Sequence, residues 1–387
     1  MADGSQTDMN SVPSGSRVRI SFFGRRNAGK STLINALTGQ SVAIVSAVAG
    51  TTTDPVSKAM EMLPLGPCLI TDTAGLDDEG ELGALRVEKT LSVLKVTDIA
   101  VWVDARVMRD DPLEAEFRAA CSARAVPVVA YRRGDSVEAL KERLAALSPT
   151  DVPPPLVADL VDAGDVVVCV CPIDGSAPKG RLILPQQQVI RELLEADCAA
   201  VVCQPSRLAS TVARLGADSI RFVVTDSQAF GEVDRILPKG IALTSFSILF
   251  ACQKGDLAAY CAGARALSGL KDGDTVLIAE GCTHHRQCND IGSVKLPRGL
   301  QRFTGRKLNF VFCSGSDFTL DPAKPPALVV HCGGCMLTRR AVMGRIAAAQ
   351  AAGVPIVNYG IALALMNGIE VRPDTRMTVR GTGGADS

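Results

Sequence analysis

Several kinds of residue and segment are scarce or missing in this sequence. Only three of its 387 residues are histidine, and 41 basic side chains are balanced by 41 acidic ones. A net charge of zero argues against a partner attracted by bulk charge, such as nucleic acid or an anionic membrane. No apolar run approaches the length of about 18 residues that predicts a membrane-spanning helix. We therefore predict a protein that binds neither nucleic acid nor membrane and recognises its partners locally.

The N-terminal stretch lacks the pattern of a secretory signal. "MADGSQTDMNSVPSGS" has no charged start followed by an apolar core. The thirteen cysteines are an odd number in a long chain, unlike the even set of a small disulfide scaffold. These features predict a cytoplasmic protein whose thiols are reduced.

The sequence does contain a repeated alternation of short apolar runs and helical stretches. Runs such as "RVRISFFG", "CLITDTAG" and "AVPVVAY" alternate with helical segments, which is typical of parallel strands joined by crossover helices. A proline-rich break, "SPTDVPPPLVADL", is followed by two more alternations, the first of which contains the apolar run "IALTSFSILFA" at 241–251. We expect that run to be a strand that either pairs with a second copy or is buried within the chain. The predicted fold class is α/β with mainly parallel sheets.

A phosphate-binding motif lies between the first predicted strand and the first predicted helix. "GRRNAGKS", 24–31, fits G-x-x-x-x-G-K-[ST] in the strand-loop-helix context that this motif requires. Its amides would bind phosphate, Lys30 would neutralise the β and γ groups, and Ser31 would bind magnesium. The residues expected to contact the nucleotide or its metal are Gly24, Asn27, Gly29, Lys30, Ser31 and Thr32.

Two shorter motifs follow in the order of nucleotide switches. "DTAG" ends a predicted strand, where Asp72 can reach magnesium through water and the Gly75 amide can sense the γ-phosphate. "GTTTD", 50–54, lies between the two motifs in a polar stretch. Together the three motifs resemble the TrmE-Era group of GTPases. The resemblance implies a P-loop GTPase domain in which Thr52 completes the magnesium shell, and GTP hydrolysis by Lys30, Thr52, Asp72 and Gly75.

Two positions bear on ion and base selectivity. Asn27 matches an asparagine that helps to bind potassium in the potassium-activated members of the group, although a loop asparagine can equally cap a turn. Guanine recognition in the group uses N-K-x-D, whereas "YRRGDS" offers Asp135 with Arg132 and Arg133 in place of Asn and Lys. A helix follows at once, without room for a sixth strand. We expect slow hydrolysis that potassium stimulates, and weaker or altered recognition of guanine.

A second constellation combines cysteine with histidine. "GCTHHRQC", 281–288, and "HCGGC", 331–335, each directly follow the carboxyl end of an apolar run. Right-handed crossovers would therefore bring both groups to one edge of a sheet. Three thiolates and an imidazole suit either a closed zinc site or a 4Fe–4S cluster, while buried structural cysteines are the alternative. The candidate ligands are Cys282, His284, His331, Cys332 and Cys335, with Cys288 as a further candidate.

Longer stretches carry a closer resemblance. They are "SAPKGRLILPQQQVIRELLEADC" at 176–198, "CTHH" with "DIGSVKLP" at 282–297, "HCGGCMLTRR" at 331–340 and "GVPIVNYGIA" at 353–362. Following the GTPase motifs, they make nearly the whole chain resemble the HydF family of FeFe-hydrogenase maturation GTPases.

This second resemblance implies a scaffold or carrier of three domains that works as a homodimer. Three cysteines of the family hold a 4Fe–4S cluster, here Cys282, Cys332 and Cys335, and the fourth iron keeps an exchangeable ligand, for which His284 and His331 are candidates. The cargo is a diiron precursor, built with two radical-SAM maturases and delivered to apo FeFe-hydrogenase. The expected boundaries are 1–15 for a disordered tail, 16–150 for the GTPase domain, 151–164 for a linker, 165–253 for a dimerisation domain and 254–387 for a cluster domain.

Two other functions fit the same motifs. The first is an iron–sulfur carrier with a degenerate nucleotide domain, which "YRRGDS" would permit. The second is an RNA-binding or ribosome-assembly GTPase of the TrmE-Era type with a structural zinc. The zero net charge and the lack of a basic patch interleaved with aromatic residues weigh against the second.

Overall fold

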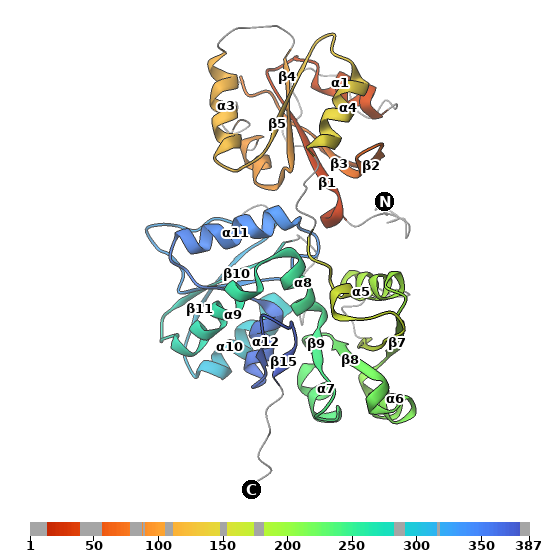
Figure 1. Ribbon diagram of the computed structural model, residues 1–387. Coiled ribbons are helices and arrows are strands. Elements are labelled where there is room, and N and C mark those ends of the chain that lie inside the picture. The colour runs from red at the N-terminus through yellow and green to blue at the C-terminus, as the bar shows by residue number, and fades with distance from the viewer. Residues whose placement is uncertain are drawn as a thin grey trace, which may run out of the picture. The chain divides into compact units, whose positions relative to one another are not determined.

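The computed structural model (Figure 1) describes most of the chain in two compact units. The units are Met1–Val152 and Pro153–Ser387, so the division falls inside the stretch predicted to be a linker. Within the part described, no helix is long and apolar enough to cross a membrane. The described residues are 14–38, 56–77, 87, 90–104, 111–147, 153–173, 182–281, 291–315 and 318–379. Nearly all of the expected tail, the switch motif with Thr52, and the candidate ligands Cys282, His284 and Cys288 lie outside them.

The first unit is built on a five-stranded sheet in the order β2-β3-β1-β4-β5. Its strands are β1 (Val18–Phe23), β2 (Val56–Met62), β3 (Gly66–Asp72), β4 (Ile99–Asp104) and β5 (Val128–Arg132). All pairs are parallel except β2 with β3. Helix α4 (Val137–Ala146) follows β5 after a short turn. Among the described residues no sixth strand joins this sheet.

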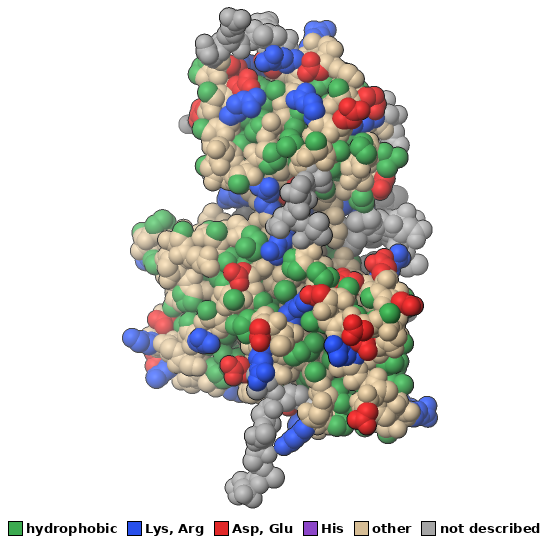
Figure 2. Space-filling model, in the orientation of Figure 1, with side chains coloured by type: hydrophobic (Ala, Val, Ile, Leu, Met, Phe, Trp, Pro, Cys, Tyr) green, Lys and Arg blue, Asp and Glu red, His purple; other side chains and the backbone are tan. Residues whose placement is uncertain are grey.

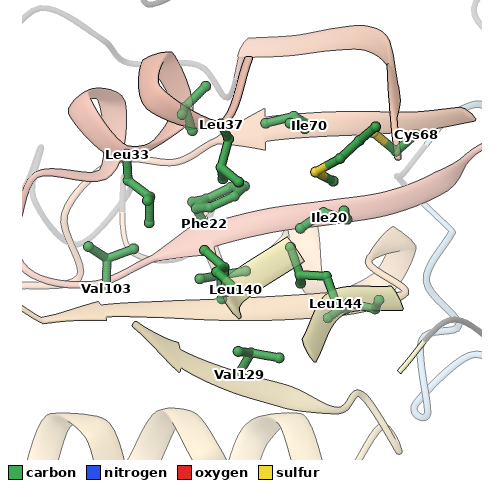
Figure 3. Packing of buried hydrophobic residues seen from close by; sticks show 14 residues of the cluster. Ile20, Phe22, Leu33, Leu37, Cys68, Ile70, Val103, Val129, Leu140 and Leu144 are labelled. Atoms are coloured by element: carbon green, nitrogen blue, oxygen red, sulfur yellow. The ribbon is translucent and has the colours of Figure 1, made fainter. Parts of the chain in front are cut away.

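Helices cover both faces of this sheet. Helices α1 (Lys30–Thr38) and α4 pack on one face, and α3 (Pro112–Ser122) packs on the other. Because successive strand residues point to opposite faces, Phe22 and Phe23 of β1 belong to different hydrophobic clusters. Burial on both faces also explains why β4 is a nearly continuous apolar run. The first cluster (Figure 3) includes Ile20, Phe22, Leu33, Leu37, Cys68, Ile70, Val103, Val129, Leu140 and Leu144.

The second unit contains two four-stranded parallel sheets with the same strand order. One sheet runs β7-β6-β8-β9 and the other runs β11-β10-β12-β13. In each, the first strand in the chain lies between the second and the third, so each sheet changes direction beside its first strand. The strands are β6 (Val166–Val170), β7 (Ala199–Cys203), β8 (Ile220–Thr225), β9 (Leu243–Ser245), β10 (Thr275–Ala279), β11 (Asn309–Cys313), β12 (Leu328–His331) and β13 (Ile356–Asn358). These sheets confirm the predicted α/β class with mainly parallel strands.

Helices join these strands, and a short antiparallel pair lies near the end of the described chain. The helices are α5 (Leu184–Glu195), α6 (Leu208–Leu215), α7 (Phe230–Ile236), α8 (Phe246–Lys254), α9 (Leu257–Arg265), α10 (Leu296–Thr304), α11 (Arg339–Ala351) and α12 (Tyr359–Met366). The pair is β14 (Glu370–Val371) with β15 (Thr378–Val379).

The run "IALTSFSILFA" does not form the long strand that the sequence analysis expected. Only Leu243–Ser245 is a strand, and α8 begins immediately after it. Ser245 caps this helix, because its Oγ accepts from the Ile248 amide at 3.2 Å. An all-apolar run does not reveal its period, so a buried helix and a buried strand look alike in the sequence. Phe246 and Phe250 of α8 are buried within the chain, which removes this run as a dimerising strand.

Candidate functional site

The phosphate loop joins the end of β1 to the start of α1. Gly24 has φ +148° and Gly29 has φ +92°, both in the region that favours glycine. Asn27 lies in the left-handed region at φ 59°, which asparagine tolerates better than most residues. A Cβ on Gly24 would lie 2.2 Å from the Val103 carbonyl oxygen. The loop thus packs tightly against β4 and leads directly into the N-terminus of α1, the end of a helix that attracts phosphate.

We expect Gly24→Ala to lower the free energy of unfolding of the first unit by about 2 to 4 kcal/mol, since an overlap with backbone adds to the strain of a positive φ. Urea denaturation followed by circular dichroism measures this change. The matched control is Gly66→Ala, at φ +88° with no atom within 4 Å of its added Cβ. Equal destabilisation in both variants would show that the contact with Val103 is unimportant.

Lys30 and Ser31 stand at the first turn of α1. The Lys30 Nζ donates to the carbonyl oxygens of Gly24 at 3.2 Å and Arg25 at 2.9 Å. These bonds keep the buried ammonium group against the loop, where the β and γ phosphates of a nucleotide would bind. Thr32 follows in the same turn of the helix.

Two of the three residues predicted to bind magnesium, Ser31 and Asp72, come together between α1 and β3, while the third, Thr52, lies outside the described residues. Ser31 Oγ donates to Asp72 Oδ2 at 2.6 Å, while Asp72 Oδ1 is buried and has no hydrogen-bond partner among the residues that the structure describes. Burial raises the pKa of Asp72, and the Ser31 hydrogen bond and the Lys30 charge oppose that rise. A buried carboxylate oxygen with no partner is costly unless something binds it. A hydroxyl beside a carboxylate fits magnesium, with Ser31 and Asp72 as the residues that would hold it.

The "DTAG" segment contacts the phosphate loop directly. The Leu76 amide donates to the Gly24 carbonyl at 3.2 Å, and the Arg26 amide donates to Asp77 Oδ1 at 2.5 Å. A Cβ on Gly75 would lie 2.7 Å from the Arg26 nitrogen, so this approach requires glycine. Gly75 therefore lies where its amide can report the presence of a γ-phosphate.

Asp135 closes a turn after β5. Its Oδ2 accepts from the Arg132 amide at 2.9 Å, and its own amide donates to the Arg132 carbonyl at 2.9 Å. The side chain is exposed at the carboxyl edge of the sheet. Its predicted contact with a guanine base stays a prediction.

The sequence analysis missed an ion pair that links the phosphate loop to α3. Arg25 Nη2 lies 2.8 Å from Asp111 Oδ1, and the Asp111 side chain is almost completely buried. The same oxygen accepts from the Leu113 amide at 3.0 Å and so caps α3. The Asp-Pro pair in the sequence marks a helix start. Nothing in the sequence indicates that Arg25 is the partner.

The carboxyl ends of β10 and β12 form the second candidate site. These neighbouring strands lie where the order of their sheet changes direction, the usual position of ligand sites in open parallel sheets. The Gly281 amide donates to Cys332 Sγ at 3.0 Å, and the Gly334 amide donates to the same sulfur at 3.4 Å. Cys282 is the next residue in the sequence after Gly281. Two segments about 50 residues apart thus meet at one sulfur atom, as the crossover rule predicts.

His331 is completely buried, and both of its ring nitrogens have partners. Nδ1 lies 2.6 Å from the Cys332 carbonyl oxygen, and Nε2 lies 3.1 Å from Arg345 Nη1. Because a carbonyl only accepts and a guanidinium only donates, Nδ1 carries the proton. Burial, then the Arg345 charge, lowers the pKa of His331 to about 3, so the ring is neutral. As an iron ligand, His331 would have to give up its contact with Arg345.

Arg345 is a second functional candidate that the sequence analysis missed. It is 7% exposed, and it donates to the carbonyl oxygens of Glu280 and Gly315 as well as to His331. Its guanidinium carbon lies 5.2 Å from the centre of the Phe318 ring. Burial lowers the pKa of Arg345, and the charge of Cys332 opposes this effect. The sequence did carry a signal for this residue. The buried face of α11 consists of small or apolar residues apart from Arg345, so an arginine at that position stands out.

Cys332 and Cys335 fit the chemistry of thiolates bound to a metal. Cys332 accepts amide hydrogen bonds, and the charges of Arg345 and Lys254 act on Cys332 and Cys335 respectively. Amide donors and nearby cations stabilise sulfur that carries negative charge. No group of three or more His, Cys, Asp or Glu that could hold a metal occurs among the described residues, a set that excludes Cys282 and His284. The two described cysteines suit zinc and a 4Fe–4S cluster alike.

Comparison with protein families matches three regions of the chain. Residues 19–131 match the 50S ribosome-binding GTPase family. Residues 156–255 match the hydrogen maturase F dimerization domain, and residues 258–373 match the hydrogen maturase F tetramerization domain.

Curated relatives that match part of the chain are GTPases. The tRNA modification GTPase MnmE of Zymomonas mobilis is 40% identical over 87 residues, which are 22% of this chain and 20% of MnmE. GTPase Der of Wolinella succinogenes is 40% identical over 91 residues, 23% of this chain and 19% of Der. The chain thus spans about a fifth of the length of these relatives.

Among solved structures, Era from Aquifex aeolicus bound to GDP.AlF4− aligns over 77% of this chain and 92% of its own at 17% identity, with a TM-score of 0.26. The family assignment comes instead from the three matched regions. A GTPase domain followed by both hydrogen maturase F domains shows that the chain belongs to the hydrogen maturase F family of GTPases.

Proposed function

We propose that this chain is a GTP-hydrolysing scaffold of FeFe-hydrogenase maturation. It would hold a 4Fe–4S cluster on Cys282, Cys332 and Cys335, accept a diiron precursor as cargo, and deliver that precursor to apo FeFe-hydrogenase. Three thiolate ligands leave one iron for an exchangeable ligand, and through that position cargo can be loaded and released. The observation that supports the proposal is the contact of the Gly281 amide with Cys332 Sγ, because Gly281 directly precedes Cys282 in the sequence.

The nucleotide site supports GTP hydrolysis in this proposal. Lys30 would neutralise the β and γ phosphates, and Ser31 and Asp72 would hold magnesium. Bound magnesium supplies charge neutralisation on the phosphates. Gly75 sits against the phosphate loop, so an ordered "DTAG" segment can report the γ-phosphate to other parts of the protein. Asn27 would help to bind a potassium ion that stimulates GTP hydrolysis.

Nucleotide state would regulate contacts with the partners, which are the two radical-SAM maturases and apo-hydrogenase. Pull-down of each partner with GTP, with GDP and without nucleotide tests this regulation. Equal binding of every partner in all three states would refute it.

The dimerization and tetramerization domains indicate an oligomer, and β7 is the surface we propose for pairing with a second copy. It is an edge strand of its sheet, and Val202 on it is 46% exposed. Exposed apolar edge strands are prone to pair with another chain.

We expect Val202→Lys to halve the mass of the main species in light scattering, because a charge on an edge strand opposes pairing. The control is Leu63→Lys, a change of a 77% exposed side chain in the GTPase domain. An unchanged mass for Val202→Lys would place the interface elsewhere.

The experiment that tests the proposed function is metal analysis of protein purified and reconstituted without oxygen. About four irons and four sulfides per chain, the composition of one 4Fe–4S cluster, would support the scaffold. One zinc without sulfide would make the site structural and would favour a ribosome-assembly or RNA-binding GTPase instead. Against that second reading, basic and acidic side chains are mixed on the face shown in Figure 2.

A further inference from the structure

The loop that carries Cys332 and Cys335 is fastened to a helix of the other domain in the second unit. Helix α8 ends at Lys254, inside the region that matches the dimerization domain, whereas the loop lies inside the region that matches the tetramerization domain. Two basic side chains connect the helix and the loop, one from each side. Lys254 Nζ donates to the Leu337 carbonyl at 2.9 Å, and Arg339 reaches back to the end of α8.

Arg339 acts as a cap for α8. Its Nη1 donates to the carbonyl oxygens of Cys252 at 3.4 Å, Gln253 at 2.8 Å and Gly255 at 3.1 Å. The last carbonyls of a helix have no partner within the helix, and the helix dipole makes that end negative. One guanidinium therefore satisfies several of these oxygens while it fixes the start of α11, which directly follows the cysteine loop.

Lys254 brings a positive charge into the interior beside Cys335. The lysine is 6% exposed, and a buried ammonium group is costly unless hydrogen bonds and a negative charge balance it. The Lys254 Nζ donates to the carbonyl of Leu337, which follows Cys335 by two residues in the same loop, so the charge lies against that loop. Cys335 also packs against the hydrophobic cluster around the β7-β6-β8-β9 sheet of the dimerization domain. This cluster includes Phe246 and Phe250 of α8. Cys335 thus packs against the dimerization domain, and Lys254 of that domain is bonded to the same loop.

We propose that two domains build the metal site: Lys254 supplies the buried cation opposite Cys335, and Arg339 clamps the Cys-x-x-Cys loop to the end of α8. Both are positioning residues. The role of Lys254 toward the metal rests on the proposed function, whereas the clamp does not depend on any metal. A disturbance of the dimerization core at α8 would then reach the metal ligands through these two side chains.

Hydrogen exchange in the metal-free protein tests the clamp. Lys254→Met and Arg339→Lys should each raise amide exchange at 333–338 by about tenfold, the factor that corresponds to one hydrogen bond from a charged donor. A lysine at 339 keeps the charge, but a single ammonium group cannot reach all three carbonyls. The control is Lys271→Gln, because Lys271 is exposed at the opposite edge of the β10 sheet. Loop exchange equal to that of the unchanged protein in both variants would overturn the clamp.

The reduction potential of the reconstituted cluster tests the electrostatic effect of Lys254 on the metal site. Lys254→Met should shift the potential to more negative values, because the reduced cluster carries more negative charge, and Lys254→Arg should restore it. Arg339→Lys should leave the potential unchanged. If Lys254→Met does not fold, Lys254→Gln takes its place. A potential that stays constant in Lys254→Met or Lys254→Gln would overturn the electrostatic role. A chain that binds no iron at all would refute the proposed function and the electrostatic role, and hydrogen exchange would still decide the clamp.

Discussion

Lys30→Ala should lower kcat for GTP hydrolysis on the order of 100-fold or more, with iron and sulfide per chain unchanged. The ammonium group is fixed over the phosphate loop by the Gly24 and Arg25 carbonyls. It acts where charge develops on the phosphates, and loss of one such preorganised group typically costs about 100- to 1000-fold. Phosphate release under saturating GTP, measured in potassium and again in sodium, gives the rate and tests the proposed role of Asn27.

The matched control for Lys30→Ala is Lys141→Ala. Lys141 lies 2.8 Å from Glu138 on α4, and a surface ion pair of this kind contributes little to stability. Hydrolysis should therefore be unchanged in the control. If neither the unchanged protein nor Lys30→Ala hydrolyses GTP in either salt, the nucleotide domain is degenerate and the chain is an iron–sulfur carrier. Equal, measurable rates in both would place hydrolysis at another site.

The second large effect is expected for Cys332→Ser, which should lower iron bound per reconstituted chain at least about tenfold. Changes in the groups that merely support a metal ligand already cost about 10- to 100-fold in metal affinity, so loss of a thiolate should cost at least as much. Cys332 also accepts hydrogen bonds from the amides of Gly281 and Gly334, so its replacement weakens the contact between the end of β10 and the cysteine loop. Iron and sulfide assays with the visible absorption of the cluster measure the result.

Cys203→Ser is the control for that experiment. Cys203 is a half-buried thiol at the end of β7, in the other sheet of the unit, and its replacement should leave the iron content unchanged. GTP hydrolysis should stay normal in Cys332→Ser if the two functions are independent. A full complement of iron in Cys332→Ser would remove this cysteine from the ligand set and refute the proposed site.

Local motifs in the sequence predicted the strand-loop-helix unit that carries the phosphate loop. The glycines, Lys30 and Ser31 act within one strand-loop-helix unit, so their spacing in the chain already determines their spacing in space. The helix pattern directly after "YRRGDS" likewise corresponds to α4. Alternating strand and helix patterns also predicted both sheets of the second unit. The prediction that 241–251 forms one long strand was wrong, because the uniformly apolar residues of this run hide the helical period.

The sequence by itself determined which chemistry this protein carries, namely a phosphate loop, a magnesium pair and cysteines placed at the ends of strands. Tertiary structure alone decided what surrounds them. The pairing of Arg25 with Asp111, the contact of His331 with Arg345 and the bond from Lys254 to the Leu337 carbonyl join residues far apart in the chain. Packing removes water from around these groups, and an unpaired charge without water is costly. Each buried charged group therefore needs a partner, and only the packed chain determines which residue is near enough to be that partner. A linear pattern records the residue types, and only the folded chain shows which of them meet.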